Sequence, residues 1–126
     1  SRYNAATGWM EGPQVDISPP DPRLTGKLWN EGPGEHRWLS NDPVPGLKFF
    51  YADEGDGWND LEISAHGMNI KTVLNGVTLV DYDGSGVLDD DLHKQHGVGA
   101  KGVIGLQIHS FHELKLRFKD LRIKEL

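Results

Sequence analysis

The dipeptide Asn75-Gly76 lies between two runs rich in apolar and β-branched residues, Met68–Leu74 and Val77–Tyr82. A two-residue turn of type I′ needs a positive φ at both central positions, and Asn-Gly is the dipeptide that adopts it most readily. The sequence therefore predicts a β-hairpin at this point. A continuous helix across the segment is excluded by the same dipeptide.

Alternation of apolar and polar residues extends this β pattern over much of the chain. Half-buried strands are predicted at Trp58–His66 and Gly102–His109, where every second residue is apolar. Further strand candidates are Gln14–Ile17, Gly26–Asn30, His36–Leu39 and Glu113–Lys124, and Asp89–His96 is the one candidate helical turn. We therefore predict an all-β fold, an antiparallel sandwich of two sheets, in a single domain over residues 1–126.

Charge and composition exclude several classes of protein. The 19 acidic residues outnumber the 13 basic ones and give a net charge of −6, which argues against a nucleic-acid partner. No run of 18 apolar residues occurs, so no membrane span is predicted. There are no cysteines, which excludes a disulfide scaffold and a thiolate metal site.

Strand parity predicts an unusual set of side chains on the outer faces of the strands. If Leu28 and the apolar residues of the neighbouring strands face the core, Trp29 and several polar residues face outward. The outward set is Gln14, Asp16, Lys27, Trp29, Gln107 and His109. An indole among polar groups suits a sugar ring, whose C–H bonds pack on the indole while its hydroxyls form hydrogen bonds. The alternative is that Trp29 packs under a Pro-rich loop and the others are ordinary surface.

Two segments have partial metal-site spacing. Asp81, Asp83 and Ser85 resemble the start of an EF-hand loop, but Leu92 occupies the position of the required bidentate Glu, which favours a solvated loop. His93 and His96 have the helical spacing of zinc ligands, yet no third ligand is evident, which favours two surface histidines. No cofactor is predicted on these grounds, and a divalent metal stays an open alternative.

Several motifs occur together in a characteristic order. They are Gly57-Trp58-Asn59-Asp60-Leu61-Glu62-Ile63, Leu74-Asn75-Gly76, Gly102-Val103-Ile104-Gly105-Leu106-Gln107-Ile108-His109 and the run Leu116–Leu126. Upstream of them, Gly12–Ile17 and Thr25–Trp29 fit the same pattern. In this order the chain resembles the C-terminal two-thirds of the 3-keto-disaccharide hydrolase family, a former domain of unknown function.

The resemblance implies a concanavalin- or laminin-G-like jelly roll, an exported location (periplasmic or extracellular) and an enzyme that acts on 3-keto-glycosides. A ketone at C3 of a sugar acidifies the proton at C2. A base can remove that proton, an enolate forms, and the aglycone leaves C1; water can then add back. Such a site needs a base near C2, a donor or metal at the ketone oxygen, and an acid at the leaving oxygen.

Family position and outward parity together give the candidate site. The candidate acid and base groups are His109, Asp16 and Lys27. The candidate substrate-binding residues are Trp29, Gln14, Gln107, Lys71 and Glu31. In this scheme Trp29 stacks on the sugar, and the two glutamines hold hydroxyls or the ketone.

The family's domain carries a further stretch ahead of the part that this chain resembles. A sandwich without those strands would expose sheet edges and apolar surface. We therefore expect an incomplete jelly roll whose missing strands come from a second chain or from a second copy. Two other functions stay open for the same fold: a non-catalytic glycan-binding module, and a structural subunit that completes another chain's sandwich.

Overall fold

The computed structural model describes residues 1–18, 24–41, 46–51, 57–99, 101–108 and 116–125. In these ranges the strands form three antiparallel sheets. They are β1 (Arg2–Asn4) with β2 (Trp9–Glu11); β3 (Pro13–Val15), β4 (Leu28–Asn30) and β5 (Arg37–Trp38); and β6 (Leu61–His66), β7 (Asn69–Leu74) and β8 (Val77–Asp83). A short helix, α1 (Asp91–His96), follows β8. The predicted all-β, antiparallel fold class is confirmed.

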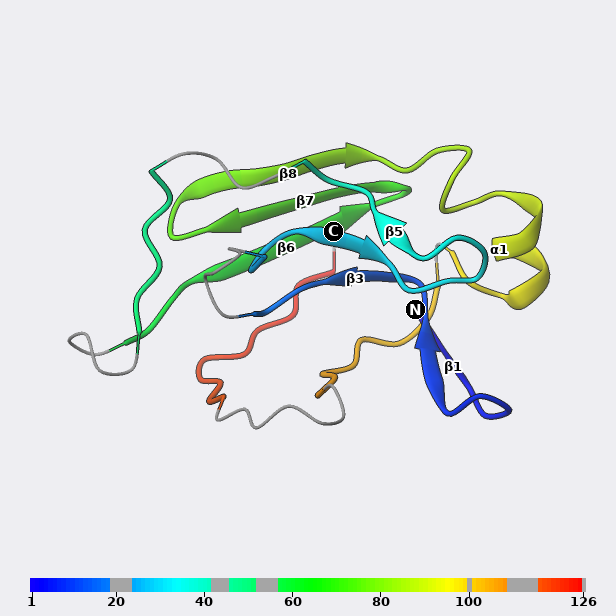
Figure 1. Cartoon of the computed structure of the whole chain (residues 1–126), viewed down its shortest axis with the longest axis horizontal. Coiled ribbons are helices and arrows are strands. Elements are labelled where there is room, and N and C mark those ends of the chain that lie inside the picture. The colour runs from blue at the N-terminus through cyan, green and yellow to red at the C-terminus, as the bar shows by residue number, and fades with distance from the viewer. Residues whose placement is uncertain (19–23, 42–45, 52–56, 100, 109–115, 126) are drawn as a thin grey trace.

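The two three-stranded sheets lie against each other, with β1, β2 and α1 at one end of the pair (Figure 1). Buried apolar side chains from both sheets and from the segment after β8 form the core: Leu28, Ile70, Val80 and Leu88. The hydroxyl of Thr72 on β7 donates to the carbonyl of Gly26 at 2.7 Å, which joins the sheets by a buried hydrogen bond. Burial of these apolar groups is the main stabilising contribution to the layer contact.

The predicted hairpin at Asn75-Gly76 is confirmed. Both residues have positive φ, 50° and 79°, as a type I′ turn requires. The Asn75 side chain also accepts a hydrogen bond from the backbone of Asp60 at 2.9 Å and donates one to the carbonyl of Lys48 at 2.8 Å. The turn residue therefore fastens two other segments to the end of the β6–β8 sheet.

The N-terminal hairpin of β1 and β2 was not predicted from the sequence. Its loop is closed by Asn4, whose side-chain oxygen accepts from the backbone of Ala6 at 3.0 Å, and by Gly8 at φ 76°. An Asn followed by a Gly four residues later is the local signal for this turn. Pairing runs from Arg2 opposite Glu11 to Asn4 opposite Trp9.

The helical turn predicted at Asp89–His96 is present as α1. Asp90 is its N-cap, with a side chain that accepts from the backbone of His93 at 2.8 Å, and Gly97 ends it in the left-handed conformation. The helices in the described ranges are too short and too polar to cross a bilayer.

The strands predicted at Gly102–His109 and Glu113–Lys124 are wrong over their described parts, residues 102–108 and 116–124. Both parts are irregular in Figure 1, where the chain runs as an orange-to-red trace. Ile104, Leu106 and Ile108 were expected in the core, yet they are 82%, 63% and 72% exposed. Alternation decides which residues share a face, but a strand also needs a partner edge for its backbone groups.

Candidate functional site

The side chains of β4 point alternately to the two sides of its sheet. Leu28 and Asn30 point into the interior, at 0% and 3% exposure, so Trp29 between them points to the outer side. Gln14 on β3 and Trp38 on β5 lie directly opposite Trp29 in the register and share that side. The two indole rings meet edge to face, with centroids 5.0 Å apart and an interplanar angle of 69°.

Asp16 and Lys27 continue this face beyond the ends of β3 and β4. The backbone N–H of Asp16 donates to the carbonyl of Lys27 at 3.0 Å, and the N–H of Gly26 donates back to the carbonyl of Asp16 at 2.8 Å. The Gln14 side-chain amide donates to the Asp16 carboxylate at 3.0 Å. The carboxylate is therefore held on the same side as the indoles.

Lys27 and Glu31 complete the outer face, which we call the Trp29 face (Gln14, Asp16, Lys27, Trp29, Glu31 and Trp38). Lys27 is only 5% exposed, and its ammonium lies 4.5 Å from the centroid of the Trp38 ring. A cation at that distance is attracted to the ring face. The indole N–H of Trp29 donates to the Glu31 carboxylate at 2.8 Å, which fixes the orientation of the ring.

Chemically, the Trp29 face holds two carboxylates, one of them bonded to the Trp29 indole, a largely buried ammonium group and an aromatic platform. A carboxylate can accept a proton, an ammonium can stabilise a developing oxyanion, and an indole can pack on the C–H face of a sugar. The structure thus brings together five of the predicted site residues: Gln14, Asp16, Lys27, Trp29 and Glu31.

Of the other predicted residues, Lys71 is directed away from this face. Lys71 lies on β7 between buried Ile70 and Thr72, so its side chain is directed to the other side of the β6–β8 sheet, away from β4. Gln107 lies on the exposed segment 102–108. His109 lies outside the described residues.

The calcium candidate lies at the end of β8. The Asp83 carboxylate accepts from the backbone of Ser85 at 3.0 Å, and hydrogen bonds from Ser85 hold the pKa of Asp83 below its usual range. Asp81 accepts instead from the side-chain amide of Asn69 at 3.2 Å. In the described part of the chain, no group of three His, Cys, Asp or Glu side chains is placed to hold a metal ion. The calcium site stays a prediction.

The comparisons with known proteins now bear on this geometry. The sequence profile of the 3-keto-alpha-glucoside-1,2-lyase-like domain matches residues 1–124. The chain belongs to this family. Searches of curated proteins and of solved structures gave no match. The resemblance stated from the motifs is thereby confirmed for nearly the whole chain, and the Trp29 face belongs to a 3-keto-glucoside lyase-like domain.

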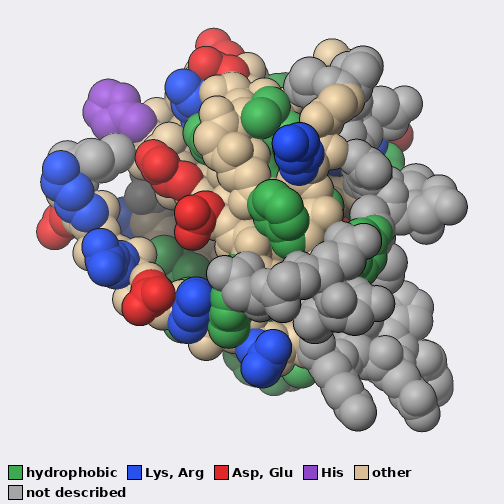
Figure 2. Space-filling view, turned by 90° about the vertical axis from the view of Figure 1, so that its left-hand side faces the viewer, with side chains coloured by type: hydrophobic (Ala, Val, Ile, Leu, Met, Phe, Trp, Pro, Cys, Tyr) green, Lys and Arg blue, Asp and Glu red, His purple; other side chains and the backbone are tan. Residues whose placement is uncertain are grey.

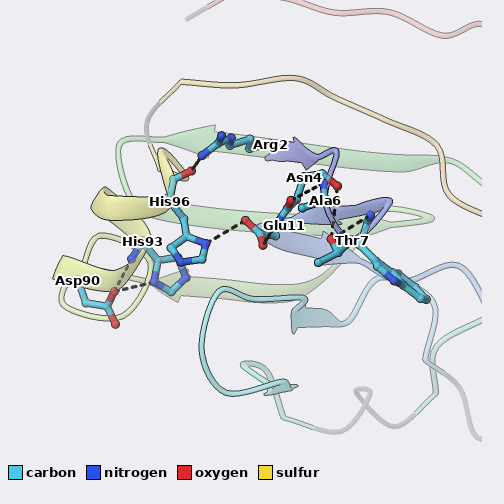
Figure 3. A network of polar contacts seen from close by, with 9 residues as sticks. Arg2, Asn4, Ala6, Thr7, Glu11, Asp90, His93 and His96 are labelled. Atoms are coloured by element: carbon cyan, nitrogen blue, oxygen red, sulfur yellow. Dashed lines mark hydrogen bonds and ion pairs between the residues drawn. The ribbon is translucent and has the colours of Figure 1, made fainter.

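A second group of polar residues in this lyase-like domain joins α1 to the N-terminal hairpin (Figure 3). The Nδ1 atom of His96 lies 3.3 Å from the Glu11 carboxylate, and the guanidinium of Arg2 donates to the carbonyl of His96. Asn4 donates to Glu11 at 2.8 Å. The hydrogen bond from Asn4, with smaller contributions from His96 and Arg2, lowers the pKa of Glu11.

The interpretation of His93 as a surface residue was wrong. Its side chain is only 3% exposed, and its Nδ1 atom lies 2.8 Å from the Asp90 carboxylate (Figure 3). His93 follows the N-cap by three residues, so its ring turns back toward that cap. The cap signal at Asp90 could have indicated the pair, whereas the burial depends on contacts with distant segments.

On the face that Figure 2 shows, charge is mixed rather than segregated, because basic and acidic side chains are interspersed with hydrophobic ones. Such a face lacks the single-sign field that attracts a polyanion.

Proposed function

We propose that this lyase-like domain acts on 3-keto-glycosides by removing the proton at C2, so that the aglycone leaves C1. The observation that carries the proposal is the position of Asp16 and Lys27. They lie opposite each other just beyond the ends of β3 and β4, on the same face as Trp29. Family membership supports the substrate class. A later addition of water would give net hydrolysis.

In this reaction the Asp16 carboxylate accepts the C2 proton. The electron pair of the C–H bond moves into the C2–C3 bond, and negative charge develops on the ketone oxygen. Lys27 stabilises that charge, because an ammonium near a developing oxyanion favours the transition state over the substrate. As the enolate collapses, the bond between C1 and the aglycone oxygen breaks, and the leaving oxygen takes a proton from an acid such as His109.

The sugar itself packs on Trp29 in the same scheme. Glu31 holds the indole through its N–H, and the Gln14 amide holds Asp16, so both groups are oriented before substrate arrives. Orientation of this kind lowers the entropic cost of the reaction. A binding module would need the platform but not the carboxylate and ammonium pair.

The test is turnover of a methyl 3-keto-glucoside by the wild-type chain and by two variants. Asp16→Asn and Lys27→Met should each reduce kcat/KM by about 10²- to 10⁴-fold, the usual contribution of a positioned acid or base. Lys48→Met, an exposed change outside the Trp29 face, is the matched control. Full turnover in both site variants refutes the assignment, and binding without turnover in the wild type replaces it with a glycan-binding module.

We further propose that a second chain or a second copy covers the segments 102–108 and 116–125. Their exposed apolar residues support it, with Ile104 at 82%, Leu121 at 72% and Ile123 at 83% exposure. Large apolar side chains gathered on exposed segments are typical of an interaction site. The alternation of apolar residues along these segments suits the addition of strands from a partner.

A further inference from the structure

A small cavity lies between the β4–β5 connection and the region of α1, on the interior side of β4 and thus away from Trp29. Its volume is about 190 Å³. It is lined by Asn30, Pro33, Gly34, Glu35, Arg37, Gly86, Val87, Asp90 and His93. None of these residues belongs to the Trp29 face, so the cavity is a separate feature of the fold.

Two deeply buried polar atoms at this cavity lack a hydrogen-bond partner among the residues that the structure describes. They are Oδ1 of Asn30 and Nε2 of His93. The two residues are 3% and 2% exposed. A buried polar atom without a partner costs about 1–3 kcal/mol, and native proteins rarely retain one without a reason. Both residues line the cavity, so a small turn of either side chain would bring its unpaired atom to a ligand held there, which would supply the missing hydrogen bond.

The neighbouring contacts define what each atom can do. The Nδ2 group of Asn30 donates to the carbonyl of Glu35 at 2.9 Å, so Oδ1 is the acceptor that remains. The Asp90 carboxylate already accepts from the backbone of His93, and it also lies 2.8 Å from Nδ1. An ionised carboxylate only accepts, so Nδ1 carries the ring proton. In the neutral ring Nε2 then presents a lone pair.

The chemistry of the lining favours a neutral ligand with two donors. Of the three charged side chains that line the cavity, Arg37 pairs with Glu35 at 3.4 Å, and the Asp90 carboxylate is bonded to the backbone N–H and Nδ1 of His93. Pro33 and Val87 add apolar surface. The described residues place no third acidic or imidazole ligand with His93 and Asp90, which disfavours a metal ion. The volume is many times the roughly 10–15 Å³ that a cavity needs to hold one water, which leaves room for one small ring.

We propose that this cavity binds one sugar ring or a similar polyol, with two hydroxyl groups donating to Asn30 Oδ1 and His93 Nε2. Pro33 and Val87 pack against its C–H groups. The site is distinct from the proposed reaction at Asp16 and does not depend on it.

The test is a titration of the full chain with D-glucose, followed by ¹⁵N NMR of the imidazole nitrogens. A saturable shift of the His93 Nε2 resonance, with Nδ1 still protonated, is expected in the millimolar range typical of weak sugar binding. Val87→Phe fills the cavity without removing either polar atom and should abolish the response. Val77→Phe, at the exposed hairpin, should keep it.

Three outcomes overturn the proposal: no saturable response to glucose, an equal response in Val87→Phe, or a response to ammonium chloride but not to glucose. The Asp16→Asn variant separates this site from the proposed reaction. It should lose turnover of the 3-keto-glucoside and retain the glucose response at His93. A wild type that shows no turnover but retains the glucose response at His93 would overturn only the proposed function.

Discussion

The hydroxyl of Thr72 donates a 2.7 Å hydrogen bond to the carbonyl oxygen of Gly26, across 46 residues of sequence. This contact joins β7 to the residue that precedes Lys27. The sheets approach so closely here that a Cβ on Gly26 would collide with the Leu79 side chain, and the φ of Gly26 is +88°. The same contact therefore supports the fold and sets the position of the Trp29 face.

Replacement of Thr72 by Val should weaken the link between the sheets. The variant keeps the shape of the side chain but leaves the Gly26 carbonyl without its buried donor, which costs about 1–2 kcal/mol of unfolding free energy. Urea unfolding followed by circular dichroism measures the change. Thr78→Val, at an exposed position on β8, is the control and should unfold at an unchanged urea concentration. Equal urea midpoints for Thr72→Val and Thr78→Val would show that the Thr72–Gly26 hydrogen bond does not stabilise the fold.

Asn75→Gly should also destabilise the domain. Glycine retains the positive φ of the turn, but it loses the side-chain hydrogen bonds to Asp60, Lys48 and Asn59. A reduction of about 1–3 kcal/mol is expected from three such bonds at a partly exposed site. The thermal midpoint provides the measurement. Gly76→Ala is the companion variant, because it keeps those bonds and strains only the turn; an unchanged midpoint in Asn75→Gly would show that they contribute nothing.

Trp29→Ala should weaken substrate binding more than it slows the chemical step. Loss of the aromatic platform removes about 1 kcal/mol of packing, which corresponds to a rise in KM of roughly fivefold. Steady-state kinetics with the 3-keto-glucoside separate KM from kcat. Trp9→Ala is the matched control, since Trp9 lies on β2 outside the face. An unchanged KM in Trp29→Ala would remove the platform from the proposed site.

Stability in acid should depend on Glu11. Its pKa in the folded chain lies below the ordinary value of a glutamate, mainly because Asn4 donates to its carboxylate. A lowered folded pKa contributes stability that is present above the unfolded pKa and is lost as pH falls through the folded one. Glu11→Gln should therefore be less stable than the wild type at neutral pH, and the difference should shrink below about pH 4.

Urea unfolding at a series of pH values measures this difference. Glu62→Gln, an exposed change on β6, is the control variant. The two proteins could instead differ by the same unfolding free energy at every pH down to acid. That result would show that the network in Figure 3 does not stabilise the ionised Glu11 carboxylate.

The exposed segment 102–108 should control assembly. If a second chain or copy covers it, native mass spectrometry of the wild type should show a mass above that of one chain. The double variant Ile104→Lys and Ile108→Lys should shift the population to the single chain, because charges on this segment oppose the addition of a strand from another chain. Val77→Lys, at an exposed hairpin residue, should leave the assembly intact. A wild type that is a single chain at all concentrations would refute a second copy as the partner and leave only a different chain.

The sequence alone determined the local elements. Asn75-Gly76 specified its turn because few residues tolerate positive φ, and Asp90 and Gly97 delimited α1 by capping. Period-two alternation also separated the two sides of β4, so that Leu28 and Trp29 were assigned to opposite faces. These features depend on neighbours in the chain, which a sequence displays directly.

Tertiary structure decided the rest. Ile104 and Ile108 alternate as a strand would, yet they are exposed, because pairing requires an edge that a sequence does not locate. His93 has the sequence context of a surface residue, yet it is buried at a cavity with Asn30, which is 63 positions earlier by residue number. Burial and proximity result from the packing of distant segments, whereas the sequence by itself records only the local preferences that such packing selects among.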